Sequence, residues 1–177
     1  MTKAAFHDEV RIFPYREEWV ERFRLTKEAI IAILLAADIE CSVRHVGGTA
    51  VRGMCSKPIV DVLVMVETER LSDAVEKLSE EYLCLGECGR PERYFFSDGD
   101  DEHSAVYIHL TTPENRVAKE QLAFLELLRA SPNLCEEYAA LKMQLAEKYP
   151  QDRLGYRLEK GAFIRRYLRE KSGEKIC

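Results

Sequence analysis

The hydrophobic positions in the first part of the chain predict one helix followed by two strands. Residues 40–46 alternate between apolar and polar positions, whereas residues 58–66, PIVDVLVMV, are almost continuously apolar. The second pattern is typical of a central strand buried on both faces. In residues 15–37, apolar side chains recur at spacings of three, four or seven, which predicts an amphipathic helix; they are Trp19, Phe23, Ile30, Leu34 and Ala37.

The pattern in the rest of the chain predicts one more helix, a pair of strands and three further helices. Residues 69–82 have helical spacing, and residues 93–97 and 104–112 predict strands joined by the acidic turn DGDDEH. Two strands around such a turn indicate a hairpin. The last three helices are predicted over 115–131, 132–149 and 151–171, with breaks at Ser131-Pro132 and at Pro150.

Together these elements predict an α+β fold, in which a small mixed sheet is flanked by helices and carries a C-terminal helical layer. We expect residues 1–177 to form a single domain. Its sheet-containing part would cover about residues 1–113 and its helical part about residues 114–172.

Composition narrows the classes of function. The 177 residues are 46% hydrophobic and 32% charged, with a net charge of −5, so nucleic acid is not an expected partner. No run approaches the length of a membrane span, and the first residues lack the apolar core of a secretory signal, so we expect a cytoplasmic protein. The six cysteines form no Cys-x-x-Cys pair, which indicates neither a zinc site nor a disulfide framework.

The loop HVGGTAVRGMCSKPIVD, residues 45–61, is the first candidate for chemistry. Gly47 and Gly48 allow backbone N–H groups to approach an anion, and the hydroxyl of Thr49 adds a donor. Arg52 and Lys57 supply positive charge, and a helical turn after the glycines would favour a phosphate as well. The alternative is a glycine-rich crossover loop whose basic residues are solvated.

Asp61 interrupts the apolar strand that follows this loop. A buried carboxylate is costly unless it is paired, hydrogen-bonded or bound to a cation, so we expect a metal ligand or a ligand-binding acid. A structural acid that accepts backbone N–H groups is the alternative. His109 shares a strand face with Tyr107 and is expected beside Asp61 as a metal ligand or proton acceptor, or else as a core histidine. His45 is expected to be structural, and Cys55 has no evident base to activate it.

Gly-Gly, twelve intervening residues and then an aspartate resembles the pattern of the polymerase-β-like nucleotidyltransferase superfamily. The chain resembles the GrpB family within that superfamily almost end to end. This resemblance is carried by FPYREEW, HVGGTAVRGMCSKPIVD, YIHL, LAFLELLRASPN, EYAALKMQLA and YRLEKGAFI.

The resemblance implies a nucleotidyltransferase fold that binds a nucleotide or another phosphorylated small molecule through the glycine turn. It implies Mg²⁺ as a cofactor, with Asp61 as its ligand and Asp61 and His109 as catalytic residues. Lys142 and Lys160 match family elements that form a basic second wall, although as helix residues they are also consistent with surface lysines. The family's domain also occurs fused to dephospho-CoA kinases.

Several positions depart from these patterns. The superfamily's second acid is replaced by Leu63, the family's usual serine by Gly48, its usual proline by Arg52, and its Phe-Arg-Asp by residues 124–126, FLE. Only Glu126 and residues 98–101 offer further acids. Three functions stay open: a Mg²⁺-dependent nucleotidyltransferase with an unknown acceptor, a degenerate protein that binds a nucleotide or CoA without chemistry, and an accessory module.

Overall fold

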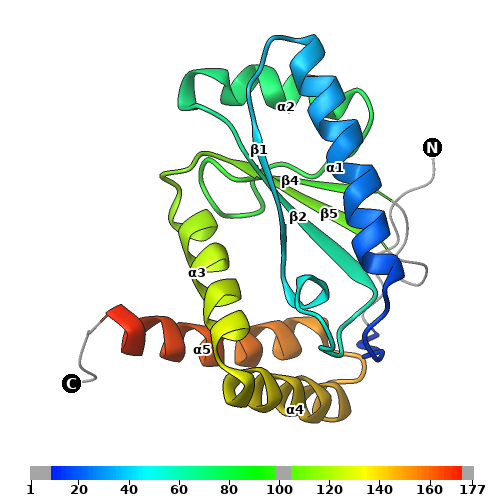
Figure 1. Ribbon diagram of the computed structural model, residues 1–177, viewed down its shortest axis with the longest axis vertical. Coiled ribbons are helices and arrows are strands. Elements are labelled where there is room, and N and C mark those ends of the chain that lie inside the picture. The colour runs from blue at the N-terminus through cyan, green and yellow to red at the C-terminus, as the bar shows by residue number, and fades with distance from the viewer. Residues whose placement is uncertain (1–8, 99–104, 173–177) are drawn as a thin grey trace.

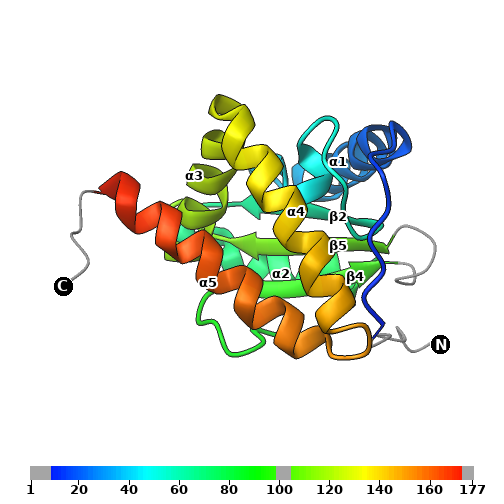
Figure 2. The same cartoon turned by 90° about the horizontal axis from the view of Figure 1, so that it is seen from below.

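The computed structural model describes residues 9–98 and 105–172, which form one mixed sheet with helices on both faces (Figures 1 and 2). The strand order is β1-β2-β5-β4-β3. Strands β2 and β5 are parallel, and the other neighbouring pairs are antiparallel. The strands are β1 (Ser42–Val46), β2 (Ile59–Met65), β3 (Leu83–Cys84), β4 (Tyr94–Asp98) and β5 (Ala105–Thr111).

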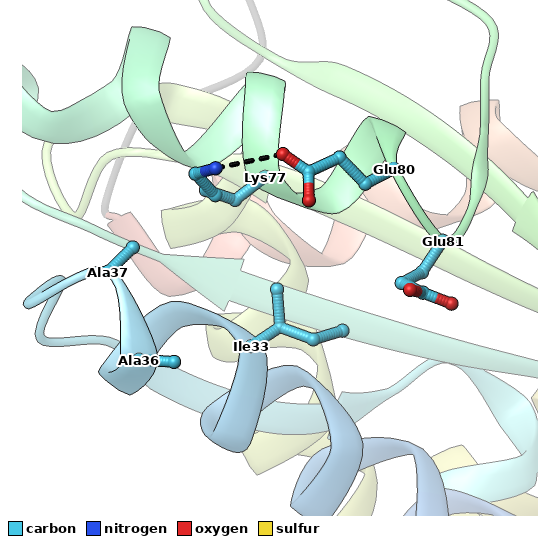
Figure 3. A pocket seen from close by; sticks show the side chains of 6 residues that line it. All are labelled: Ile33, Ala36, Ala37, Lys77, Glu80 and Glu81. Atoms are coloured by element: carbon cyan, nitrogen blue, oxygen red, sulfur yellow. Dashed lines mark hydrogen bonds and ion pairs between the residues drawn. The ribbon is translucent and has the colours of Figure 1, made fainter.

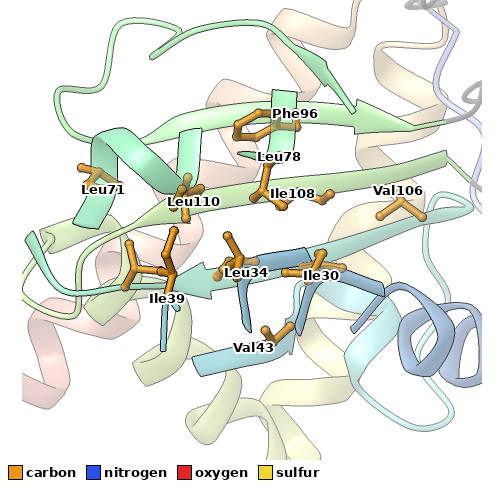
Figure 4. Packing of buried hydrophobic residues seen from close by; sticks show 14 of the residues in the cluster. Ile30, Leu34, Ile39, Val43, Leu71, Leu78, Phe96, Val106, Ile108 and Leu110 are labelled. Atoms are coloured by element: carbon orange, nitrogen blue, oxygen red, sulfur yellow. The ribbon is translucent and has the colours of Figure 1, made fainter. Parts of the chain in front are cut away.

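Side chains alternate along each strand, so the sheet has two faces of different character. One face is wholly apolar on β2 and β5 and packs against α1 (Glu18–Ala36) and α2 (Leu71–Ser79) (Figure 4). The buried residues of this face include Val62, Ile108, Phe96 and Leu34. Trp19, on α1, is fully buried in this cluster.

The second face carries Asp61, Leu63 and His109 in addition to apolar residues, because the β2–β5 register places these side chains together. Three C-terminal helices pack over this face, as Figure 2 shows. They are α3 (Arg116–Ala130), α4 (Pro132–Lys148) and α5 (Arg153–Ser172). Buried Phe124, Leu128 and Tyr138 join α3 and α4 to the strands in one cluster.

Local sequence explains where two of these helices begin. The Asn115 side chain accepts a hydrogen bond from the N–H of Val117 at the start of α3. Ser131 caps α4 by accepting from the N–H of Leu134, and Pro132 occupies the first turn. Asn and Ser at these positions satisfy N–H groups that have no partner within the helix, and proline lacks the N–H that would need one.

The predicted α+β class is confirmed, and every predicted helix and strand is present with small changes at its ends. The antiparallel pairing of β4 with β5 confirms the hairpin. The short strand β3 and the 3₁₀ turns η1 (Gly48–Ala50) and η2 (Thr68–Arg70) were not predicted. Two or three residues are too few to produce a hydrophobic period. Within the described residues, no helix is long and apolar enough to cross a membrane.

Candidate functional site

The loop between β1 and β2 turns sharply at Gly47. This residue has φ 76° and ψ −170°, a region that only glycine adopts readily. The 3₁₀ turn η1 follows at once and starts at Gly48. The sequence had left a helical turn at this place open. The loop is also paired to the N-terminal segment, since Phe13 and Ser56 exchange both backbone hydrogen bonds at 2.8 and 2.9 Å.

The hydroxyl of Thr49 is already engaged inside the protein. It donates to the carbonyl oxygen of Ile59 at 3.1 Å and lies 3.0 Å from Nε2 of His45. Because the hydroxyl has a single proton, His45 must donate to it. His45 also stacks on Phe23, and burial lowers its pKa to about 4. His45 therefore has the structural role that was expected, and the Thr49 side chain points toward the core.

Asp61 lies on the interior strand β2, directly beside the glycine turn. Its Oδ2 atom is so close to Gly47 that a Cβ at residue 47 would lie 2.6 Å from it. The Asp61 side chain is 28% exposed, and its Oδ1 lies 3.1 Å from His109 Nε2. Burial raises the pKa of Asp61, but the hydrogen bond to His109 and the charges of Lys160 and Lys57 outweigh burial and lower it. Asp61 is therefore an ionised carboxylate.

Arg93 contacts the His109 ring at the nitrogen that does not face Asp61, and the sequence did not single this arginine out. Its Nη1 lies 3.0 Å from His109 Nδ1. Both side chains are buried, with exposed fractions of 8% for Arg93 and 6% for His109. Arg93 also lies over the ring of Phe95 at 5.7 Å. Asp61, His109 and Arg93 thus form a continuous polar chain across β2, β5 and the start of β4.

Lysines approach Asp61 from the loop and from α5. Lys57 and Lys160 each lie 5.7 Å from the ring centre of Tyr156, and both act on Asp61 through their charge. Burial lowers the pKa of Lys160, which Asp61 partly restores. Arg153 donates to the Tyr107 hydroxyl at 2.8 Å on the same sheet face. The structure therefore brings the predicted residues Lys57, Lys160 and Asp61 together, and adds Tyr156 and Arg153 to them.

Lys142 is buried, with an exposed fraction of 3%. Its ammonium donates to the Cys55 carbonyl oxygen and, at 3.1 Å, to Ser56 Oγ. It also lies 5.0 Å from the ring centre of Tyr138. Burial lowers the pKa of Lys142 to about 8. These contacts join α4 to the loop, so Lys142 supports the shape of the loop from behind.

The structure offers a local explanation for Gly48, which stands where the family usually has serine. A Cβ at Gly48 would lie 2.1 Å from Ser56 Oγ and 3.0 Å from Lys142 Nζ. The Ser56 hydroxyl thus fills the space that a side chain at residue 48 would need. The sequence showed the glycine but not which side chain would replace the missing serine.

Other predicted candidates lie elsewhere. The Arg52 side chain is 86% exposed and pairs with Glu17 at 3.3 Å. Glu126 is exposed on α3. Asp98 pairs with Arg22 of α1 at 3.4 Å, and its register with Val106 places it on the opposite sheet face from Asp61. The remaining acids of the DGDDEH turn fall in 99–104, outside the described residues.

The ligand set does not fit Mg²⁺ well. Among residues 9–98 and 105–172, no three His, Cys, Asp or Glu side chains gather in a way that could hold a metal ion. Leu63, at the position of the superfamily's second acid, is fully buried. Two metal ions need several oxygen ligands, and Asp61 supplies one carboxylate, of which one oxygen already contacts His109.

A separate surface pocket lies far from this chemistry, between α1 and α2 on the other side of the sheet. It is lined by Ile33, Ala36, Ala37, Lys77, Glu80 and Glu81 (Figure 3). Lys77 is paired with Glu80 at 2.8 Å along the side of the pocket formed by α2. The pocket brings no nucleophile or metal-ligating cluster together, and we assign it no function.

The family model and the curated relatives that match this chain point to the same family. The family model described as "GrpB protein" matches residues 9–170. The chain is 30% identical over 171 residues to the glutamate-rich protein GrpB of Alkalihalophilus pseudofirmus, covering 92% of this chain and 95% of that protein. It is 34% identical over 146 residues to the UPF0157 protein YqkA of Bacillus subtilis, covering 80% of this chain and 41% of YqkA. The chain therefore spans less than half the length of YqkA.

Solved structures agree with the fold. The crystal structure of the conserved protein GrpB from Enterococcus faecalis superposes with a TM-score of 0.72 and 27% identity, covering 89% of this chain and 99% of that one. The Cid1 poly(U) polymerase, solved with Mg and 3′-dATP bound, superposes with a TM-score of 0.53 and 13% identity, covering 76% of this chain and 43% of that one. At this identity the likeness to Cid1 shows a shared nucleotidyltransferase-like fold and nothing more.

Proposed function

Because the chain belongs to the GrpB family and has a nucleotidyltransferase-like fold, we propose that it binds a nucleotide through its phosphates at the second sheet face. The glycine turn, Lys57 and Lys160 would contact the phosphates, and Asp61 would act as the ligand-binding acid. One observation supports this above the others. An ionised, partly exposed Asp61 carboxylate lies against Gly47 within the electrostatic reach of both lysines.

Charge favours an anionic ligand at this site. Lys57 and Lys160 lie near a single carboxylate, and Arg153 and Arg157 act on Lys160 by repulsion. Positive charges gathered in a partly desolvated place repel one another, and a bound anion would relieve that repulsion. The whole chain carries a net charge of −5, so the positive field is local to this face.

Binding is tested by calorimetry with ATP, GTP, CTP, UTP, CoA and adenosine. The phosphorylated ligands are expected to bind and adenosine is not, because the proposed contacts are to phosphate. Lys160→Gln is expected to weaken ATP binding at least about tenfold, the effect of losing roughly one charged hydrogen bond. Lys171→Gln is the matched control, since it removes the same charge from an exposed position at the far end of α5. Equal effects of the two changes, or equal binding of adenosine and ATP, would refute the site.

Mg²⁺-dependent nucleotidyl transfer to an acceptor is a second candidate. It is favoured by the position of Asp61 on the strand after the glycine turn and opposed by the poor ligand set for metal. Asp61→Asn separates the two functions, because the side chains are nearly isosteric. If no cation lies between Asp61 and the phosphates, the Asn change keeps or improves ATP affinity in chelator by removing a repulsion. If Mg²⁺ is bound there, the change abolishes the Mg²⁺ dependence of ATP binding and any release of pyrophosphate.

A further inference from the structure

We propose that Arg93 is a positioning residue that fixes the tautomer of His109, so that Asp61 presents only its Oδ2 oxygen to a ligand. This assignment goes beyond the proposed function, since it concerns protons that are in place before any ligand arrives. It also gives His109 a different role from that of a proton acceptor or metal ligand.

The assignment follows from which groups can donate. A guanidinium has five N–H donors and no acceptor, and arginine stays protonated in proteins. Arg93 Nη1 lies 3.0 Å from His109 Nδ1, so Nδ1 must be the acceptor and must carry no proton. An Nδ1–H tautomer would set two donors against each other in a buried place. A doubly protonated imidazolium would add a second buried cation beside the first.

The remaining nitrogen then has a definite state. A neutral imidazole that lacks a proton on Nδ1 carries it on Nε2. His109 Nε2 lies 3.1 Å from Asp61 Oδ1, so it donates to the carboxylate. No lone pair of His109 faces Asp61, which excludes His109 as a metal ligand or general base in this arrangement.

The consequence for Asp61 is a fixed orientation. Its Oδ1 accepts from His109, and its Oδ2 lies against the glycine turn, where a Cβ on residue 47 would approach to 2.6 Å. Rotation of the carboxylate would break the hydrogen bond with His109. Contact with a ligand is therefore expected through Oδ2, on the side of the turn. Buried partners of this kind commonly orient a functional side chain.

Nitrogen-15 NMR of ring-labelled histidine tests the tautomer in the unliganded wild-type protein. His109→Gln identifies the His109 signals by their loss from the spectrum, which contains four histidines. We expect Nε2 of His109 to be protonated and Nδ1 to be unprotonated at neutral pH. A protonated Nδ1, alone or together with a protonated Nε2, would overturn the proposal from the wild-type spectrum alone.

Variants at Arg93 then test whether this residue sets the tautomer of His109. Arg93→Met keeps an unbranched apolar stem but removes the donors, and is expected to populate the other tautomer of His109. Arg93→Lys retains a donor and is expected to restore the wild-type state at least in part. A folded Arg93→Met protein with unchanged ring signals would show that Arg93 does not set the tautomer. Circular dichroism and urea unfolding report whether each variant is folded.

The effect on affinity is the only part that rests on the proposed function. The amide nitrogen of a glutamine reaches the place of Nε2, whereas that of an asparagine reaches only the place of Nδ1. His109→Gln is therefore expected to bind ATP within about threefold of wild type, and His109→Asn to depart from the wild-type affinity by more than that. Equal changes of affinity in the two variants would refute the donor role. Absence of ATP binding by wild type would refute the proposed function but leave the tautomer measurement standing.

Discussion

Replacing Gly47 with alanine should cost far more stability than the same change at Gly53. Both glycines have a positive φ, 76° at Gly47 and 80° at Gly53. At Gly53 an added Cβ has no heavy atom within 4 Å, so only the backbone conformation opposes the change, at about 1–2 kcal/mol. At Gly47 the combination with ψ −170° belongs to a region that is essentially restricted to glycine and costs about 1–3 kcal/mol.

The Gly47→Ala change has a second cost, which comes from Asp61. The added Cβ would lie 2.6 Å from Asp61 Oδ2 and 3.3 Å from its Cβ and Cγ, so the carboxylate must move. Movement disturbs the hydrogen bond from His109, and a hydrogen bond to a charged group is worth about 1.5–3 kcal/mol. The two costs together give about 2.5–6 kcal/mol for Gly47→Ala, measured as the free energy of unfolding in urea.

A double-mutant cycle separates the clash from the backbone strain. In an Asp61→Ala background the carboxylate is gone, so the cost of Gly47→Ala should fall by about 1.5–3 kcal/mol, the part that comes from the disturbed hydrogen bond. The cost of Gly53→Ala should not change in that background. Additive effects of Gly47→Ala and Asp61→Ala, or equal costs at the two glycines, would refute the close approach of Asp61 to the turn.

Two further changes test how the loop is supported. Gly48→Ser restores the family's usual residue. It should lower the free energy of unfolding by about 1–3 kcal/mol, because the new side chain would overlap Ser56 Oγ. Adding Ser56→Gly to this variant should recover most of the loss, and no recovery would contradict the overlap. Lys142→Met should show a pH-dependent difference from wild type in urea unfolding. The pKa of Lys142 is about 8 in the folded protein against 10.5 in the reference state, so burial of its charge opposes folding fully below about pH 8. That penalty is relieved as the pH rises toward 10.5, and wild type should gain about 2 kcal/mol relative to the variant between about pH 7 and pH 10. A constant difference would contradict the buried position of the ammonium.

The elements of the fold were predictable because each long segment has a clear period. The apolar run around Val60–Val64 and the spacing in α1 identify a buried strand and an amphipathic helix without any tertiary information. The starts of α3 and α4 could also be predicted, since Asn115 and Ser131 are residue types that cap the N-terminus of a helix. The strand β3 was missed because its two residues are held only by pairing with β4.

The candidate site was predictable only in part, because side-chain direction depends on packing. The strand pattern showed that Asp61 interrupts an apolar run, and the loop showed its glycines. Nothing local indicated that the Thr49 hydroxyl turns toward Ile59 or that Arg52 extends to Glu17. Arg93 was missed for the same reason, as its burial comes from the fold around it. An arginine at the start of an apolar strand was the one available signal.

The division of the sheet into two faces explains how a charged site and a stable core coexist. On the first face, alternating positions of β2 and β5 pack against α1 and α2 without a charged side chain in the cluster. This face needs no polar compensation and provides hydrophobic stabilisation by area alone. On the second face α5 brings Lys160 near Asp61 of β2 and Arg153 to Tyr107 of β5. Burial lowers the pKa of Lys160, and the charge of Asp61 offsets this only in part, so the anion that we propose as the ligand would stabilise this face further.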